Sequence, residues 1–436
     1  MNPASHQDGT QIKLESYWLD TAPAFTAGAQ GPVAGRADVV VVGAGFTGLS
    51  AALALARRGA SVTVLEAGRV VGEASGRNGG HCNSGLAHDF GALAARLGVE
   101  KARAFYQAYD AAVDRVESIV RQENIACDFA RVGKLKLAAK PAHYDKLARA
   151  CDLLRREVDP HVEMVPAAGI RSEVGSASFH GGLLQKTSAQ MHVGKFGVGL
   201  AQAAARAGAH VYENAAVTGL DRRPDGSFRI TSARGGIDAK QVLLATGNSR
   251  TGPFFHFRRR MISVGSFIIA TEPLESALLD RLLPHRRNYV TSRNIGNYFR
   301  ISADNRLIFG GRARFAMSNP RSDQKSGRIL RAAMEEFFPK LREVRIDYCW
   351  GGLVDMTADR LPRAGEHRGM YYSTGYSGHG VQMSVHMGQV MADVMAGRAE
   401  RNPWRDLAWP AVPGHFGKPW FLPVVGAYYR FQDWLH

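Results

Sequence analysis

Apolar residues follow two alternating patterns along the chain. Val39 to Val42 is a short, continuous β-branched run, and residues 49–56 then place apolar side chains at helical spacing. A second continuous run, Val62 to Leu65, comes directly after that segment. Continuous apolar runs are typical of strands covered on both faces, and a repeat of three to four residues is typical of helices. Residues 37–68 therefore predict a strand, a tight turn, a helix and a parallel strand.

The same patterns predict helices and strands over most of the remaining chain. Helices are expected at 91–124, 142–158, 167–174, 193–207, 274–283, 326–338 and 381–395. Strands are expected at 129–138, 176–184, 210–212, 215–221, 228–231, 242–244, 344–354 and 369–373, with strand-rich sequence from 262 to 309. This order predicts the α/β class: a Rossmann-like domain interleaved with an α+β domain built on a mainly antiparallel sheet.

The predicted domains are discontinuous. The nucleotide-binding domain is assigned to 37–90, 176–250 and 345–400, and the second, substrate-covering domain to 91–175 and 251–344. Residues 1–36 form an N-terminal arm, expected on the surface. Residues 401–436 form an aromatic tail without a clear amphipathic helix, so we expect it to pack along the domain. A contact of this tail with a membrane surface or a partner is the alternative.

The turn after the first strand carries a dinucleotide signature. Gly43 allows a sharp turn, Gly45 allows close approach of a pyrophosphate, and Gly48 allows tight helix packing. Glu66 ends the second strand, where its carboxylate can accept hydrogen bonds from a ribose. A purely structural turn is the alternative, and the unit alone does not distinguish FAD from NAD.

Two further glycine-rich segments accompany this unit. The loop 72–86 offers backbone amides and the donors Ser75, Arg77 and Asn78, although a plain flexible loop has similar composition. The turn 375–380 opens a helix whose free amides suit an anion or developing negative charge. No second GxGxxG occurs, so the sequence predicts no separate nicotinamide site.

Composition narrows the class of protein. The chain has 436 residues, of which 45% are hydrophobic and 22% charged, and no apolar run is long enough to span a membrane. The first 36 residues do not resemble a secretory signal. The four cysteines show neither a CxxC pair nor metal-ligand spacing, so we expect free thiols, no metal site and a cytoplasmic location.

The formal net charge of +16 favours encounters with anions. Only residues 258–260 form a compact basic cluster, and the other basic residues are dispersed. We therefore expect a solvated basic surface and no specific nucleic-acid groove.

Four motifs together resemble the D-amino-acid-oxidase-type family of FAD-dependent oxidoreductases. They are GAGFTG with Glu66, SGRNGG at 75–80, LLATG at 243–247 and GYSGHG at 375–380, supported by WGGLVDMTADRLPRAG at 350–365. Within that family, the SGRNGG loop and the closing tail are most similar to the γ-glutamylputrescine oxidoreductase group. The resemblance implies FAD as cofactor.

The resemblance also implies which residues bind FAD. It implies that the glycine turn binds the pyrophosphate and that Glu66 binds the ribose. The backbone of Ala216 and Val217 is expected to contact the adenine, and the 75–80 loop and the 375–381 turn are expected to contact the isoalloxazine. The expected set is Gly43, Ala44, Gly45, Phe46, Thr47, Gly48, Glu66, Ala67, Ser75, Gly76, Arg77, Asn78, Gly79, Gly80, Ala216, Val217, Ala245, Thr246, Gly247, Gly375, Gly378, His379, Gly380 and Val381.

Three departures from the sarcosine-oxidase pattern change the expectation. Gly352 occupies the position of the cysteine that carries covalent flavin, and Cys349 is nearby in sequence, so we expect non-covalent FAD. Gln382 replaces a lysine that helps bind an amino-acid carboxylate, which disfavours a simple amino-acid substrate. Ile308 replaces a lysine credited with oxygen activation, which disfavours efficient oxidase behaviour.

A flavin without a nicotinamide site must receive electrons from a small reduced substrate, and the family implies an amine. His379 is the first candidate for a contact with flavin or substrate, with Tyr298, Arg300 and Arg312 expected on strands that roof the pocket. Trp350 is expected to wall the flavin or pack in the core. Oxygen or a respiratory acceptor would reoxidise the flavin, and the sequence leaves the oligomeric state open.

The expected substrate is γ-glutamylputrescine or another N-substituted amine. An N-methyl or cyclic amino acid is the near alternative. A tRNA-modifying flavoprotein and a nicotinamide-dependent reductase are alternatives of other classes.

Overall fold

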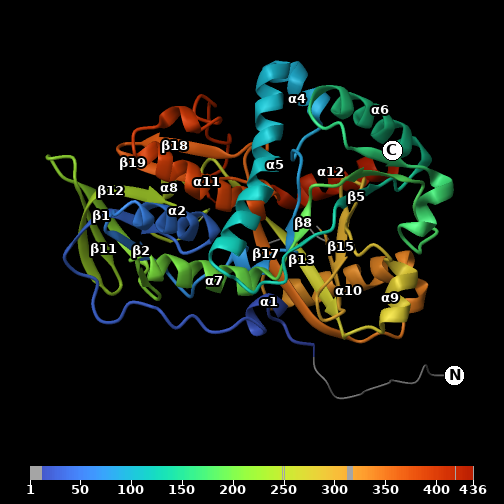
Figure 1. The fold of residues 1–436 in the computed structure, drawn as a ribbon, viewed down its shortest axis with the longest axis horizontal. Helices are drawn as coiled ribbons and strands as arrows, with labels where there is room; N and C mark the ends of the chain where they lie inside the picture. The colour runs from blue at the N-terminus through green and yellow to red at the C-terminus, as the bar shows by residue number, and fades with distance from the viewer. Residues whose placement is uncertain (1–11, 248, 250, 312–317, 418, 436) are drawn as a thin grey trace.

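The chain forms two eight-stranded sheets and a small three-stranded sheet. The computed structural model describes residues 12–247, 249, 251–311, 318–417 and 419–435. In Figure 1 the first sheet and its helices occupy the left half and the second sheet the right half. The long helix α5 (Val99–Gln122) stands between the two halves.

The first sheet is built on the predicted strand–helix–strand unit. Strand β1 (Arg36–Val42) pairs in parallel with β2 (Val62–Leu65) and with β12 (Gly235–Leu244). Val39 and Val41 join a core shared with α2 (Phe46–Arg57), whereas Val40 and Val42 face a second core on the opposite side. Both faces of β1 are therefore covered, which explains its continuous apolar run.

Five further strands and two helices among the described residues complete this half of the molecule. The sheet order is β10-β11-β12-β1-β2-β9, with β19 paired to β12 and β18 to β19. The bounds are α7 (Val193–Arg206), β9 (His210–Tyr212), β10 (Val217–Arg222), β11 (Phe228–Ser232), β18 (Arg363–His367), β19 (Met370–Thr374) and α11 (Gly380–Met395).

The second sheet is antiparallel at every described pairing except that of β14 with β5. Its order is β17 (Ile346–Met356), β13 (Ile262–Thr271), β16 (Leu307–Gly311), β15 (Asn297–Ile301), β14 (Asn288–Thr291), β5 (Lys134–Leu137), β7 (Gly182–Gln185) and β6 (Glu163–Val165). Helices α9 (Ser276–Leu282) and α10 (Pro320–Phe337) contribute to the apolar core of this half. The prediction of an α/β nucleotide sheet joined to a mainly antiparallel sheet is confirmed.

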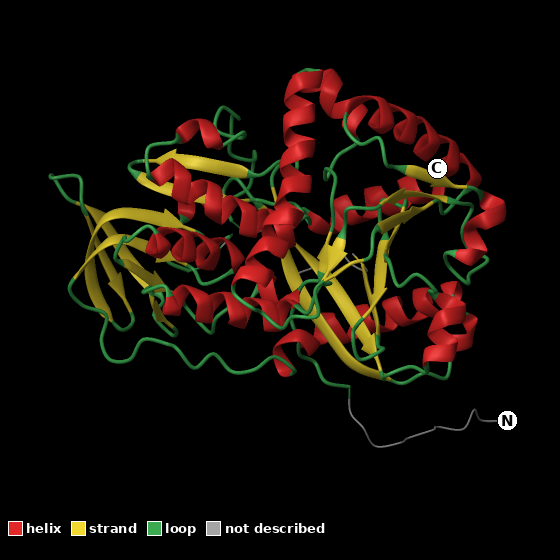
Figure 2. Cartoon of the chain, viewed as in Figure 1, coloured by secondary structure: helices red, strands yellow, loops and turns green. Residues whose placement is uncertain are grey.

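A small sheet and several further helices complete the fold, and Figure 2 distinguishes helices, strands and loops by colour. The small sheet joins β3 (His81–Cys82), β8 (Ala189–Gln190) and β4 (Ala130–Arg131). The remaining elements are α1 (Tyr17–Asp20), α3 (Ala74–Arg77), α4 (Phe90–Leu97), α6 (Pro141–Glu157), the 3₁₀ turns 167–172, 339–341 and 399–401, α8 (Phe255–Arg258) and α12 (Leu422–Leu435).

Several predicted boundaries are wrong. The helix expected over 91–124 breaks at Gly98, whose φ of +86° is outside helical space. Strands β7 and β17 lie within ranges predicted for the nucleotide domain, but both pair in the second sheet, where β17 runs along β13 for most of its length and β7 lies between β5 and β6.

The aromatic tail also differs from its prediction, because it contains α12. Within the tail, Trp404 is buried, as expected for packing, whereas Trp420 is 73% exposed. No helix in the described ranges is both long and apolar enough to cross a bilayer.

Candidate active site

The turn after β1 has room only for glycine. Gly43 has φ +104°, and a Cβ there would lie 2.7 Å from the Ala245 carbonyl oxygen. A Cβ on Gly48 would lie 1.9 Å from the Gly43 carbonyl oxygen. Gly45 is the N-cap of α2. The first turn of α2 therefore sits directly against β1, with its amides at the carboxyl end of the sheet.

Glu66 lies at the same edge, at the end of β2. Its carboxylate accepts hydrogen bonds from the N–H groups of Ala44 (2.7 Å) and Gly68 (2.9 Å). Burial raises the pKa of Glu66. The N–H of Ala215 donates to the Glu66 carbonyl (2.6 Å), so Ala216 and Val217 follow immediately beside this acid, as a shared adenosine site requires.

The N-terminal arm reaches the 75–80 loop and holds its backbone. Ser16 Oγ donates to the Gly76 carbonyl at 2.6 Å, and Trp18 Nε1 donates to the Asn78 carbonyl at 2.7 Å. Ser16 is 0% and Trp18 1% exposed. The prediction of a surface arm is therefore wrong for this part of it, because its polar donors are used inside the molecule.

The second sheet holds the alternate carbonyls of the same loop. Trp350 Nε1 donates to the Arg77 carbonyl (3.0 Å), and Arg300 Nε donates to the Gly79 carbonyl (2.8 Å). Four consecutive carbonyls, from residues 76 to 79, thus each accept one side-chain donor. We call these four donors, Ser16, Trp18, Arg300 and Trp350, the carbonyl clamp.

The carbonyl clamp orients the amides of the loop. In a trans peptide the carbonyl of one residue and the N–H of the next point in opposite directions. With the Arg77 and Asn78 carbonyls turned toward the clamp, the N–H groups of Asn78 and Gly79 point the other way. Neither N–H has an acceptor among the described residues. They are available to hydrogen-bond acceptors of a ligand beside the loop.

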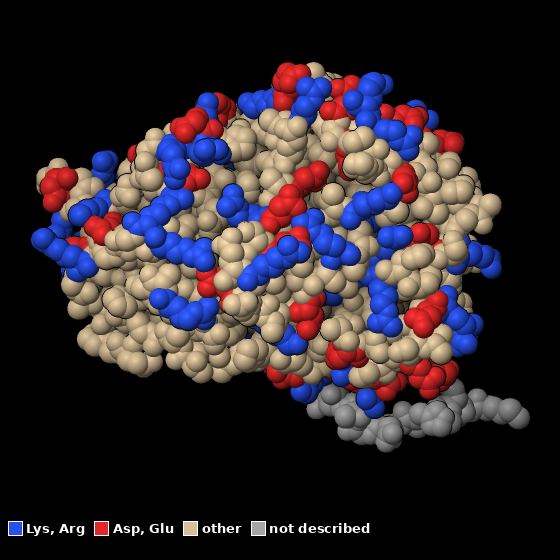
Figure 3. All heavy atoms as spheres, viewed as in Figure 1, with Lys and Arg blue, Asp and Glu red and all other residues tan. Residues whose placement is uncertain are grey.

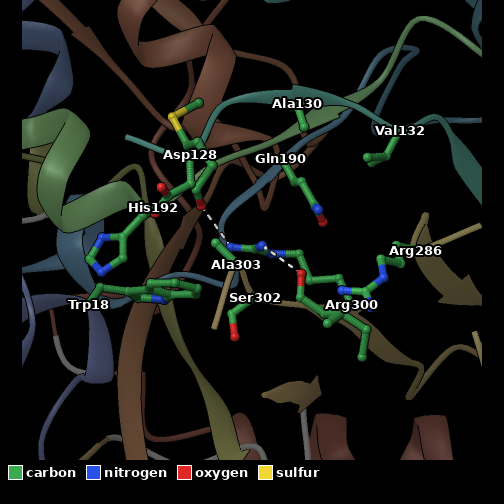
Figure 4. Close-up of a pocket in the computed structure, with 12 residues that line it drawn as sticks. Trp18, Asp128, Ala130, Val132, Gln190, His192, Arg286, Arg300, Ser302 and Ala303 are labelled. Carbon is green, nitrogen blue, oxygen red and sulfur yellow. Dashed lines mark hydrogen bonds between the residues drawn. The ribbon is translucent and has the colours of Figure 1, made fainter. Parts of the chain in front are cut away.

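Arg300 lies on β15, as predicted, with its side chain buried against backbone carbonyls. It is 2% exposed, its Nη2 donates to the Met191 carbonyl at 2.7 Å, and its guanidinium carbon lies 4.8 Å from the Trp18 ring centroid. Figure 4 shows it beside Trp18 in a cavity of about 230 Å³ that Asp128 and Gln190 also line. Burial lowers the pKa of Arg300 to about 9. Its described hydrogen bonds all go to backbone carbonyls, and a contact of Arg300 with substrate stays a prediction.

Tyr298 lies on the same face of β15, against the 75–80 loop. A Cβ on Gly79 would lie 2.7 Å from its ring, and its hydroxyl is 3.0 Å from Ser266 Oγ. Its ring centroid is 5.2 Å from that of His81. Tyr298 therefore stands where the loop meets the second sheet, as expected for the roof of a pocket. Arg312 lies outside the described residues.

The 375–380 turn lies against the start of α2. Thr47 Oγ1 and the Tyr376 hydroxyl are 2.8 Å apart, and a Cβ on Gly388 would lie 2.5 Å from the Thr47 carbonyl oxygen. His379 is the N-cap of α11, with its ring centroid 5.8 Å from that of Tyr109. The structure thus packs the start of α2 against Tyr376 of the turn and against the middle of α11 at Gly388.

Cys349 and Gly352 face opposite sides of β17. The Cys349 thiol is 3.2 Å from the Asp323 carbonyl, on α10. A Cβ on Gly352 would instead lie 3.2 Å from Arg77, in the loop. The cysteine is therefore turned away from the loop, which agrees with a non-covalent cofactor.

Sequence reasoning missed the two arm residues of the clamp. The one available signal was an aromatic pair, Tyr17 and Trp18, within an otherwise polar arm. Large aromatic side chains in such a segment often mark a place where the chain packs onto the core.

The comparisons with known proteins agree with this arrangement. Residues 38–394 match the family described as DAO, FAD dependent oxidoreductase. The chain is 32% identical over 403 residues to gamma-glutamylputrescine oxidoreductase of Escherichia coli K12, covering 91% of this chain and 93% of that protein. It is 32% identical over 412 residues to the probable oxidoreductase OrdL of Haemophilus influenzae, covering 91% and 92%.

Solved structures share the fold at lower identity. Glycine oxidase from Geobacillus kaustophilus superposes with a TM-score of 0.69 at 21% identity, covering 87% of this chain and 98% of that one. L-amino acid deaminase from Proteus vulgaris gives 0.70 at 17% identity, covering 88% and 100%.

Proposed function

The chain belongs to the DAO family of FAD-dependent oxidoreductases, and from this premise we propose that its substrate is γ-glutamylputrescine or a related N-substituted amine. The protein is an FAD-dependent oxidoreductase of the kind that acts on amines and amino acids. The observation that carries the finer proposal is the 32% identity, over nearly the whole of both chains, to gamma-glutamylputrescine oxidoreductase.

The residues present fit FAD. The turn at Gly43 and Gly48 has no room for a Cβ, Glu66 supplies a half-buried carboxylate, and the amides of Asn78 and Gly79 are directed away from the carbonyl clamp. We assign the pyrophosphate to the start of α2, the ribose to Glu66 and the isoalloxazine to the loop and the 375–381 turn. Bound by these residues, FAD would supply the acceptor for a hydride from the carbon next to the amine nitrogen, and the imine left behind would be hydrolysed by water.

The residues of the protein orient the cofactor, stabilise developing charge and limit the access of water. The amides of Asn78 and Gly79 orient the ring system through hydrogen bonds, and the N-terminus of α11 at His379 supplies a positive dipole end toward developing negative charge. Tyr298 closes the side next to the second sheet and limits the access of water. No strong side-chain base is required, because the amine reacts in its unprotonated form.

A second candidate substrate is an N-methyl or cyclic amino acid. Relatives named glycine oxidase and sarcosine oxidase subunit beta, each 26% identical, favour it. Gln382, in place of a carboxylate-binding lysine, argues against it.

A tRNA substrate has weaker support. On the face in Figure 3, Lys and Arg are interspersed with Asp and Glu over both halves, without a continuous basic groove. Tight, salt-sensitive binding of tRNA in a gel shift would favour this alternative over a metabolic amine.

The test of the proposal is anaerobic mixing of the FAD-loaded protein with γ-glutamylputrescine, sarcosine, pipecolate and NADPH in separate experiments. We expect γ-glutamylputrescine to bleach the flavin absorbance fastest. Bleaching by sarcosine or pipecolate alone would replace the proposed substrate, and bleaching by NADPH alone would make the protein a reductase. Readmitting air then tests oxygen as electron acceptor.

A further inference from the structure

Three side-chain amides form one hydrogen-bonded cluster between the flavin-binding segments and the second sheet. Asn83 follows the 75–80 loop, Gln382 lies in the first turn of α11, and Asn288 begins β14. We propose that this amide cluster recognises the N–H donors of the substrate through Gln382 Oε1 and Asn288 Oδ1. The inference rests on the proposed oxidation of an amine and adds how the amine is selected.

The hydrogen-bond network fixes which way each amide faces. Gln382 Nε2 donates to the Asn83 backbone carbonyl at 2.5 Å. Asn288 Nδ2 donates to the Ala189 carbonyl at 2.7 Å and to Asn83 Oδ1 at 2.8 Å. A backbone carbonyl can only accept, so the NH₂ group of each amide must point toward it, and a flipped amide would place two acceptors together.

This orientation leaves two buried acceptors. Gln382 is 1% and Asn288 0% exposed. Neither Gln382 Oε1 nor Asn288 Oδ1 has a hydrogen-bond partner within the part of the chain that the structure describes. A buried oxygen without a donor is unfavourable, so the pair is suited to a ligand that brings N–H groups. A carboxylate would bring only further acceptors.

A neutral amide oxygen is a suitable hydrogen-bond acceptor for an amine that reacts in its unprotonated form. A carboxylate side chain here would stabilise the ammonium form, whose nitrogen lone pair is already bonded to a proton. An amide oxygen accepts the N–H of the neutral amine without that bias.

The charged groups near the cluster do not reverse this preference. The Lys134 side chain, paired in register with Asn288, donates to the Ser84 carbonyl at 2.8 Å, and burial lowers its pKa to about 7. The Asp110 carboxylate accepts from the Gly85 N–H at 3.2 Å, and burial raises its pKa to about 6. Above pH 9 the lysine is therefore neutral and the carboxylate is charged, which does not favour a carboxylate ligand.

The test compares two probes that share a tert-butyl group and differ in the polar end, on the oxidised, FAD-loaded protein. tert-Butylamine carries N–H donors but no hydrogen on the carbon next to nitrogen, so it cannot be oxidised; pivalate is its carboxylate counterpart. Binding is followed by the change in flavin absorbance above pH 9, where more of the amine is neutral. We expect tert-butylamine to bind about tenfold more tightly than pivalate.

Gln382→Arg supplies the second arm of the test. Its guanidinium stays charged above pH 9, can still donate to the Asn83 carbonyl and offers no acceptor, so we expect the order of the two probes to reverse. Gln389→Arg, on the same helix, where the amide donates to the Ser50 carbonyl at 2.8 Å, is the matched control and should retain the wild-type order.

Three outcomes would overturn the inference. They are equal binding of the probes by the wild type, an unchanged order in Gln382→Arg, and a Gln382→Met variant that no longer retains FAD through gel filtration, since this would place Oε1 against the cofactor. A wild type that prefers tert-butylamine but is bleached by no amine would refute the proposed function and leave the inference standing.

Discussion

Replacing Trp18 with phenylalanine tests whether the carbonyl clamp positions the flavin loop. The substitution keeps an aromatic ring but removes the indole N–H that donates to the Asn78 carbonyl at 2.7 Å. With FAD bound, the loop must keep its orientation, so this buried carbonyl is left without a donor. Without FAD, the loop can turn that carbonyl toward water, and much of the cost disappears.

The expected loss of FAD affinity follows from that difference. An unsatisfied buried carbonyl costs about 1–3 kcal/mol, which corresponds to a dissociation constant about 5- to 150-fold higher. The smaller ring adds about 1 kcal/mol of lost packing, which lowers stability with or without FAD. The effect on FAD binding should therefore exceed the effect on the thermal stability of the apoprotein.

Trp404→Phe is the matched control. Trp404 is also 1% exposed, but its indole nitrogen has no hydrogen-bond partner among the described residues. Titrating each apoprotein with FAD and following flavin fluorescence gives the dissociation constants. If the two variants bind FAD within about twofold of each other, the clamp does not act through the indole N–H, and the reasoning is refuted.

Three further predictions follow from individual residues. Gly48→Ala should prevent retention of FAD through gel filtration, because its Cβ would lie 1.9 Å from the Gly43 carbonyl oxygen, whereas Gly169→Ala, whose Cβ would approach Pro166 no closer than 3.6 Å, should retain it. His379→Ala should slow anaerobic flavin reduction by the amine about tenfold or more while leaving FAD bound; unchanged reduction kinetics would remove His379 from the active site. Burial raises the pKa of Asp110 from 3.8 to about 6, so the folded protein holds a proton that the unfolded chain has released between these values. Stability should therefore fall by about 1–3 kcal/mol as the pH rises through this window. Asp110→Asn should flatten the melting temperature between pH 4 and 6, and a wild-type profile in the variant would contradict the assignment.

The sequence was sufficient where structure depends on neighbours along the chain. The apolar run at 39–42, the glycine turn and Glu66 predicted the unit β1–α2–β2, and that unit fixed the edge where the dinucleotide binds. Periodicity likewise predicted α6, α7 and α11 to within one or two residues. Such elements can be predicted from neighbouring residues, because the apolar positions along the sequence repeat with the same period as the helix or strand itself.

Contacts between distant parts of the chain came only from the tertiary structure, because hydrophobic periodicity carries no information about them. In the sequence, Arg300 is one polar position in an alternating strand pattern, like many exposed sheet residues. Only the folded chain shows that its guanidinium donates to the Gly79 carbonyl. The helix in the tail was missed because Val424, Tyr428 and Phe431 are exposed rather than buried. The pairing of β17 with β13 joins segments far apart in sequence.

By itself, then, the sequence determined the fold class and the cofactor, and it predicted the glycine turn as the place where the cofactor binds. The carbonyl clamp and the amide cluster came only from the tertiary structure. Ser16, Trp18, Arg300 and Trp350 donate to four successive carbonyls, although up to 334 positions separate the members of the clamp. A hydrogen bond depends on distance and angle, and the fold alone sets both for residues this far apart.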